Sequence, residues 1–467
     1  MGSTRQLAHR RANMKAKGGV QLVGSLRSQG ANSEVRPCVG RTQVQCVLRS
    51  VGHRLALAGV LFFLPLVPPC FADPWSDVKG RASEAGITPT VVYDGTVAAN
   101  LSGGERNGIA FAGAAHLQIL GDGTRLVDAP GLTIYADILN THGKEPSALV
   151  GDIQGVSNIA APPDIRIYEA WAQYNWRSSS LLIGRYDLNT EFYRLASSSV
   201  FLNSSFGIGP EFSQSGPAGA SIYPDTSLGA RIAYKPDPNV VIRVALMDGA
   251  PVERPQSEGG LFSSRDGVFI MSELAILTRP GADMQPGAVR SLIGRMSTLP
   301  PYEDKFAIGG WYYTSDLDDL SERNANGSPV KHAGSGGAYA LLDERLFEIG
   351  NAHINGFLQA GLGDGRVNRV DSYVGFGLAA TGVIAERPND QLGLALAVAG
   401  NGSHFLAASE NLEPQYATTE ATLEMTYVCQ ATSWLAIQPD LQYVWHPGAV
   451  PGLHNAAVVQ VEFETSF

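Results

Sequence analysis

Cysteine is scarce in this chain, and its scarcity excludes a fold that is held together by disulfides. The 467 residues include 4 cysteines, and three of them, Cys38, Cys46 and Cys70, precede residue 73. Only Cys429 remains beyond that point, so no intrachain disulfide is possible there. A chain that is exported without disulfides is expected to be stabilised by a large hydrogen-bonded sheet instead.

Long hydrophobic runs are also missing. The apolar stretch at residues 55–67 is too short to cross a bilayer as a helix, which needs about 20 residues. Arg49 and Arg54 precede it, and the small residues Cys70 and Ala72 follow it. We therefore predict a secretory signal peptide that is cleaved near Ala72.

Two other interpretations of the amino terminus are weaker. An N-terminal anchor helix would need a longer apolar stretch. A lipid anchor on Cys70 fits poorly with the preceding Pro68 and Pro69. Residues 1–48 precede the signal and show no structural pattern, so we expect a wrongly assigned start codon. The predicted leader is 1–72, followed by a short periplasmic segment at 73–89.

Basic residues are few once the leader is set aside. Beyond residue 72 the chain holds 24 lysines and arginines against 43 acids, a net charge of −19. A nucleic-acid partner is not expected at this charge, because phosphate groups would be repelled.

Long amphipathic helical windows are almost absent after residue 90, which argues against a soluble α/β enzyme. Segments of about ten residues with alternating polarity are present instead, the pattern of a transmembrane β-barrel. In the last segment Val459, Val461 and Phe463 share one face, and Gln460, Glu462 and Glu464 share the other. A closed barrel satisfies every backbone hydrogen bond in lipid without leaving a free edge.

The pattern gives seventeen candidate strands, of which one does not fit. The candidates are 90–101, 108–120, 131–140, 164–176, 180–188, 226–236, 239–248, 267–278, 289–298, 305–315, 335–346, 352–362, 370–382, 390–400, 416–429, 433–446 and 456–467. Single-chain bacterial barrels have even strand numbers, short periplasmic turns and longer external loops. Short turns and long loops alternate along the chain only if residues 289–298 do not form a membrane-spanning strand. The prediction is therefore an all-β antiparallel barrel of about sixteen strands over 90–467, with long external loops at 141–163, 189–225, 249–266, 316–334 and 401–415.

Residue patterns that carry covalent chemistry or bind metals are missing. The chain has no Gly-x-Ser-x-Gly motif, and the histidines after residue 72 show no metal-ligand spacing. The glycine-rich piece at 361–365 falls between predicted strands and is interpreted as a turn. We predict no catalytic residues, no metal and no cofactor.

Several groups of residues occur in a specific order along the chain. They are Trp75, Gly80-Arg81, Gly86-Ile87 and Gly103-Gly104; Glu169-Ala170-Trp171 with Gly184-Arg185-Tyr186-Asp187-Leu188-Asn189; Phe201-Leu202-Asn203-Ser204-Ser205-Phe206-Gly207 with Tyr223-Pro224; and Gln438-Pro439-Asp440-Leu441-Gln442-Tyr443-Val444 before the strand that ends at Phe467. In this order they resemble the OprB-type carbohydrate-selective porins across residues 73–467. The chain departs from the family pattern at 82–85, where a leucine is usual, and at Ala449, where a glycine is often found.

The resemblance implies passive diffusion of monosaccharides such as glucose, and of other small hydrophilic solutes, across the bacterial outer membrane. The expected partners are these solutes and outer-membrane lipid. The terminal aromatic Phe467 resembles the signal that hands barrels to the assembly machinery, and a monomer or homotrimer is expected. An outer-membrane barrel enzyme or adhesin, a non-selective porin and a secreted β-sandwich are the alternatives.

A pore of this kind needs a constriction and groups that hydrogen-bond to sugars. We expect the loop at 189–225 to fold inward; a surface-exposed loop is the alternative. Strand parity predicts that six pore-lining or sugar-binding residues face the lumen: Glu169, Trp171, Arg185, Asp187, Arg231 and Arg243. Weaker candidates for the same face are Lys305, Trp311, Tyr313 and Glu344. The residues expected on the lipid side are Tyr186, Tyr234, Tyr312 and Tyr427.

Overall fold

The computed structural model describes residues 74–251, 266–278, 304–410 and 415–467. The predicted leader and the rejected strand at 289–298 lie outside these residues. Among the described residues, no helix has the length and apolar character needed to cross a membrane. Helix α2 (Pro74–Glu84) precedes the first strand, which begins at Ile87.

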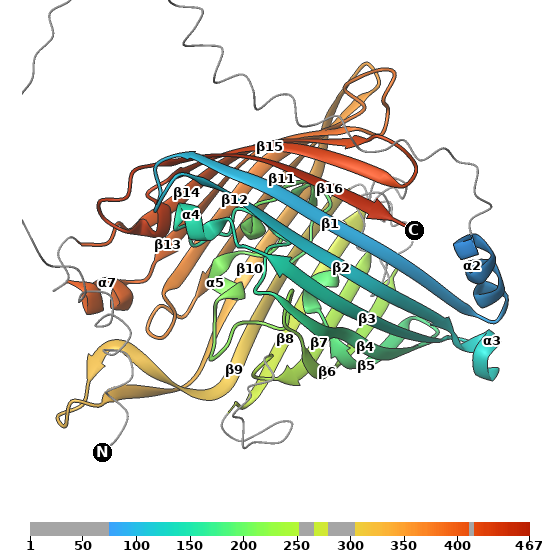
Figure 1. Ribbon diagram of the computed structural model, residues 1–467. Coiled ribbons are helices and arrows are strands. Elements are labelled where there is room, and N and C mark those ends of the chain that lie inside the picture. The colour runs from blue at the N-terminus through green and yellow to red at the C-terminus, as the bar shows by residue number, and fades with distance from the viewer. Residues whose placement is uncertain (1–73, 252–265, 279–303, 411–414) are drawn as a thin grey trace, which may run out of the picture. The chain divides into compact units, whose positions relative to one another are not determined.

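The chain forms a closed antiparallel barrel in which each strand pairs with the next and β1 pairs with β16 (Figure 1). The strands are β1 (Ile87–Ser102), β2 (Gly108–Asp122), β3 (Leu132–Gly143), β4 (Asp164–Trp176), β5 (Ser179–Tyr186), β6 (Ser227–Asp237), β7 (Val240–Asp248), β8 (Val268–Thr278), β9 (Asp304–Arg323), β10 (Pro329–Ile349), β11 (Ala352–Gly363), β12 (Val370–Thr381), β13 (Gln391–Asn401), β14 (Thr419–Gln430), β15 (Leu435–Trp445) and β16 (Ala456–Ser466). Because β8 pairs directly with β9, the ring closes with sixteen strands, as predicted.

The alternating polarity of the sequence maps onto the two faces of the wall. In β16, Val459 is exposed on the outer face, whereas Gln460, Glu462 and Glu464 are buried on the inner face. Leucine, isoleucine and phenylalanine dominate the exposed positions around the barrel. An apolar outer face is what a bilayer requires of a strand that crosses it.

The connections differ in length at the two ends of the barrel. One end, here called the short-turn end, carries the two-residue turn between β4 and β5, helix α3 (Gly123–Val127), helix α2 and the carboxyl terminus (Figure 1). The other, the long-loop end, carries helix α4 (Ser147–Val150) and helix α7 (Ser403–Ser409). Among the connections that the structure describes in full, short turns and long loops alternate as predicted, with one exception.

One predicted loop is wrong. Residues 316–334 were expected to form a long loop, but β9 continues to Arg323 and β10 begins at Pro329. The two strands keep pairing beyond the barrel wall, with Lys331 opposite Asp318, and project from the long-loop end (Figure 1). Polar residues occupy both faces there, so the alternation that identifies a strand in lipid is lost.

Candidate functional site

The connection between β5 and β6, residues 187–226, folds into the barrel as predicted; we call it the inward loop. It contains the short helices η1 (Leu188–Thr190), η2 (Ser198–Val200), η3 (Ser204–Phe206) and α5 (Pro210–Ser213). Five of its six aromatic side chains are buried, and α5 lies within the ring of strands (Figure 1). The buried aromatic residues are Phe192, Tyr193, Phe201, Phe206 and Phe212.

Carboxylates of the far wall hold the backbone of the inward loop. Glu273 on β8 accepts the N–H of Tyr193 at 2.9 Å. Asp343 on β10 accepts the N–H of Ser197 at 2.9 Å and its hydroxyl at 2.6 Å. Glu424 on β14 accepts the N–H groups of Leu202 and Asn203 at 2.6 and 3.0 Å. Buried backbone N–H groups need acceptors, so these contacts fix the path of the loop across the lumen.

Amide side chains of the wall support the same path. Gln359 on β11 donates to the carbonyl of Phe206 at 2.9 Å, and Gln438 on β15 donates to that of Val200 at 2.7 Å. Backbone carbonyls that leave regular secondary structure need such donors when they are buried. The loop is therefore anchored by both its N–H and its C=O groups.

A buried ion-pair network lies between the inward loop and strands β6 to β9. Arg231 pairs with Glu191 of the loop at 2.7 Å, and Arg243 lies 3.9 Å from the same carboxylate. Arg243 and Lys305 reach Glu273 at 3.5 and 3.3 Å. All of these side chains are almost fully enclosed. The network joins the loop to the wall instead of presenting free charges to a solute.

Three of the predicted lumen residues lie where the inward loop begins. Glu169 on β4 accepts the backbone N–H of Asp187 at 3.0 Å. Asp187 in turn accepts the N–H of Asn189 at 2.8 Å and caps η1. Trp171 stacks on Tyr135 of β3 with ring centroids 5.1 Å apart. The side chains of Glu169, Trp171 and Asp187 are buried.

The prediction for Arg185 is wrong, together with that for its neighbour Tyr186. Arg185 pairs with Ala170 and shares its face of β5 with Ile183, which is exposed. Tyr186 is 1% exposed and donates a hydrogen bond to Glu191 at 2.6 Å inside the barrel. Strand parity predicted an inward position for Arg185, but the guanidinium reaches the rim instead, where Nε donates to Thr226 at 3.0 Å.

A bulge in β4 also interrupts the alternation of the two faces. Asp137 pairs with Glu169 and Ile138 pairs with Ile167, so Tyr168 is the extra residue. Both Tyr168 and Glu169 are buried as a result. The hydroxyl of Tyr168 bonds to the carboxylate of Asp187. A bulge of this kind re-aims side chains and cannot be located from polarity alone.

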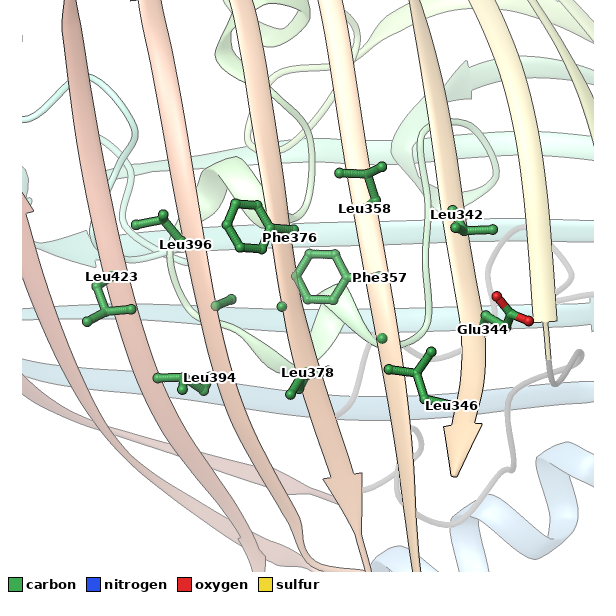
Figure 2. Close-up of a pocket in the computed structure, with 13 residues that line it drawn as sticks. Leu342, Glu344, Leu346, Phe357, Leu358, Phe376, Leu378, Leu394, Leu396 and Leu423 are labelled. Atoms are coloured by element: carbon green, nitrogen blue, oxygen red, sulfur yellow. The ribbon is translucent and has the colours of Figure 1, made fainter. Parts of the chain in front are cut away.

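The weaker candidates divide between the two faces. Lys305, Trp311 and Tyr313 are buried on the inner side of β9. The prediction for Glu344 is wrong. Its neighbour Asp343 faces inward, and adjacent residues of a strand point to opposite faces, so Glu344 lies on the outer face. Figure 2 shows Glu344 with Leu342 and Leu346 at an apolar depression on the outer wall of β10 to β14. This depression lies outside the lumen.

The predicted lipid-side tyrosines also divide. Tyr234 and Tyr312 are exposed on the outer face of the barrel, as predicted. Tyr427 is partly covered and donates to Asp390 at 2.5 Å. Tyr186 is the exception described above.

A second loop, residues 144–163 between β3 and β4, also folds inward and was not predicted to do so. Glu420 on β14 accepts the N–H groups of Ile153 and Gln154 at 3.0 and 3.1 Å. The carbonyl of Val156 accepts the amides of Gln442 and Gln460 at 2.9 and 2.8 Å. The alternation of Glu and Thr in β14 is the sequence signal, because it places carboxylates on the inner face.

Acidic side chains dominate one arc of the inner wall. On strands β14, β15, β16 and β1, which the structure describes in full, no lysine or arginine occurs. Six carboxylates face inward from this arc: Asp94, Glu420, Glu424, Asp440, Glu462 and Glu464. The opposite arc carries the paired cations Arg231, Arg243 and Lys305. Acidic residues therefore outnumber basic ones on the first arc of the inner wall.

The inward loop also encloses a carboxyl that has no cationic partner among the residues that the structure describes. Glu211 in α5 accepts a hydrogen bond from the hydroxyl of Tyr193 at 3.0 Å. Gly209 and Gly361 leave space for it, because a Cβ atom at either position would collide with the carboxyl oxygens. Burial raises the pKa of Glu211 from 4.5 to about 7.

Comparisons with known proteins agree with this geometry. A curated relative, Porin B of Pseudomonas aeruginosa, is 22% identical over 93% of this chain and 99% of its own length. A high-pH structure of Pseudomonas putida OprB superposes with a TM-score of 0.71 at 20% identity, covering 84% of this chain and 97% of that one. A low-pH structure of the same protein gives a TM-score of 0.51 at 15% identity, covering 85% and 98%.

The family comparison covers most of the barrel. The model of the carbohydrate-selective porin, OprB family, matches residues 106–467. This span includes fifteen complete strands, the inward loop and every sequence-predicted lumen residue. The chain belongs to the OprB family of carbohydrate-selective porins.

Proposed function

We propose that this porin admits small neutral sugars by passive diffusion through the outer membrane, and that the inward loop sets the width of the path. The observation that carries the proposal is the docking of the loop across the lumen, from β5 to wall residues as far away as β14 and β15. A closed barrel of sixteen strands is wide enough for an aqueous channel. A docked loop narrows that channel, and we propose that it does so to the scale of a single sugar.

The charge of the wall supports a preference for neutral over anionic solutes. The arc from β14 through β16 to β1 carries inward carboxylates and no basic residue on those described strands. Those carboxyl groups of the arc that are ionised would repel an anion in the passage, and the low dielectric of the protein wall would strengthen the repulsion. We expect glucose to pass faster than glucose 6-phosphate.

For five of the predicted site residues we propose an indirect role. Arg231 and Arg243 pair with acidic groups beneath the inward loop. Glu169 and Asp187 hold its first turn, and Trp171 packs beside them. Such groups would act on sugar passage by positioning the loop.

Planar-bilayer conductance tests the proposal directly. The purified chain should form channels whose ion current falls as glucose is added, because a sugar in the narrow section excludes ions. Liposome swelling should be faster in glucose than in glucose 6-phosphate at equal osmolarity. Channels whose current is indifferent to glucose would contradict the assignment of sugar as solute.

Passage through a channel requires no bond to be made or broken, and we propose no covalent chemistry for this member of a porin family.

We also propose that export uses a signal peptide cleaved near Ala72 and that the assembly machinery recognises Phe467. Phe467 is half exposed and stacks on Trp434 with ring centroids 6.3 Å apart, so its ring is accessible from the short-turn end. Mass spectrometry of the mature amino terminus and membrane assembly of Phe467→Ala test these two steps.

A further inference from the structure

Four side chains that could bind a metal meet at the long-loop end, away from the inward loop. Asp319 and Glu322 lie on the projecting part of β9, and His332 lies opposite them on β10. His404 lies in the first turn of α7, in the connection between β13 and β14. The group thus joins two segments that are about eighty residues apart in sequence.

The distances within this group are short. Oδ1 of Asp319 lies 2.9 Å from Nδ1 of His404, and Oδ2 lies 2.8 Å from Nε2 of His332. One ligand atom each from Asp319, Glu322 and His404 can be chosen so that all lie within 4.8 Å of one another. Zinc binds nitrogen and oxygen ligands at about 2.0–2.2 Å in a tetrahedral arrangement. The ligand atoms around one zinc ion are therefore closer to one another than the 4.8 Å given above.

The carboxylate of Asp319 is held in place by the local backbone. Its Oδ1 accepts the N–H groups of Ser321 and Glu322 at 2.9 and 2.7 Å. The side chain is buried, whereas Glu322 is exposed and His404 is partly exposed. A fixed central ligand with two accessible neighbours gives a cation a route of entry from solvent.

We propose that Asp319, Glu322 and His404 bind a divalent transition-metal cation of the zinc type, with solvent completing the coordination. The cation would replace the proton shared between Oδ1 of Asp319 and Nδ1 of His404. His332 would donate to the other oxygen of Asp319 and orient it, as outer hydrogen bonds commonly do for metal ligands. A set of imidazole nitrogen and carboxylate oxygen suits Zn²⁺, whereas Ca²⁺ and Mg²⁺ prefer oxygen alone.

The consequence of such a site is mechanical. A bound cation would tie the projecting β9–β10 hairpin to the loop that carries α7, and so fix the arrangement of two long-loop segments. Because binding displaces a proton and requires a neutral imidazole, affinity should fall as the pH is lowered.

Calorimetric titration of the purified mature chain, without the leader, with ZnCl₂ at pH 7.5 tests the site. The protein should carry no polyhistidine tag and should be stripped with a chelator that is then removed. We expect one Zn²⁺ per chain, bound at least ten times more weakly by Glu322→Gln and by His404→Ala. Ca²⁺ should bind more weakly than Zn²⁺ by a similar factor or more.

A matched control is available at the short-turn end. His353 is exposed and lies 3.3 Å from the carboxylate of Glu348, so it forms a histidine–acid pair without the other ligands. His353→Ala should leave the titration unchanged. Glu322 is exposed, so Glu322→Gln should fold normally, which heat-modifiable migration on a gel verifies. Zinc binding that is absent, or equal in wild type, Glu322→Gln and His404→Ala, would overturn the proposal and leave only a hydrogen-bonded contact.

Discussion

Replacing Arg231 with methionine should release the inward loop from the wall while leaving the barrel intact. The Arg231 and Glu191 side chains are 1% and 4% exposed and lie 2.7 Å apart, so the substitution leaves a buried carboxylate without its main partner. Removing one member of a buried ion pair costs about 3–5 kcal/mol. Glu191 keeps a hydrogen bond from Tyr186 and a distant contact with Arg243, which favours the lower end of this range.

A cost of about 3 kcal/mol shifts the equilibrium between docked and undocked loop by roughly a hundredfold, since each 1.4 kcal/mol is a factor of ten. Single-channel recording in planar bilayers should detect this shift as a larger and noisier conductance. Glucose should also reduce the current less than in wild type, because the narrow section is open for part of the time.

Two further variants separate loop release from general damage. Arg231→Met combined with Glu191→Gln removes both charges and should restore most of the wild-type behaviour. Arg366→Met breaks a pair with Asp364 that is also 2.7 Å long but partly exposed, and such pairs are worth about 0–1 kcal/mol. A conductance distribution for Arg231→Met that equals that of Arg366→Met would refute the reasoning.

Three other predictions concern the loop and the wall. Because the pKa of Glu211 is raised to about 7 in the docked loop, docking is favoured most below about pH 4.5 and weakens as the pH rises to about 7. Conductance noise should therefore increase over this pH range. The variant Glu211→Gln should abolish the increase. Gly361→Ala should displace α5 at a cost of about 1–3 kcal/mol, and the displacement should change the extent to which glucose blocks the current. Gly80→Ala is the control: its added Cβ atom has no neighbour within 4 Å, so this variant should behave as wild type. Leu394→Arg puts a charge on the outer face and should lower the free energy of unfolding in lipid by about 2–4 kcal/mol if the residue lies near the bilayer midplane. Urea titration of the refolded protein measures this change. An unchanged urea midpoint would mean that this face does not contact lipid.

The strand pattern could be predicted from the sequence because lipid and water impose opposite demands on neighbouring residues. All sixteen strands follow from this alternation, and loop lengths identify the segment that does not fit. The pattern fails where that demand is absent. The ends of β9 and β10 project beyond the wall, and polar residues such as Lys331 and Asp318 pair there without any alternation.

The site was harder to predict, because strand parity indicates which face of the sheet a side chain lies on but not which residues it contacts. Arg231 and Arg243 were placed on the inner face, yet their partners Glu191 and Glu273 come from a loop and a strand that no spacing connects to them. Arg185 was also placed by strand parity, and the register of β5 contradicts that prediction. The cluster around Asp319 has no sequence signature, because its ligands meet only when β9 and α7 come together.

The anchoring of the inward loop has a consequence for the order of assembly. Leu202 bonds to Glu424, which is 222 residues further along the chain and belongs to one of the last strands to be made. A partly built wall that lacks β14 and β15 lacks the groups that hold Val200, Leu202 and Asn203. Solute discrimination therefore arises only when the cylinder is complete, and a stalled assembly intermediate would leak.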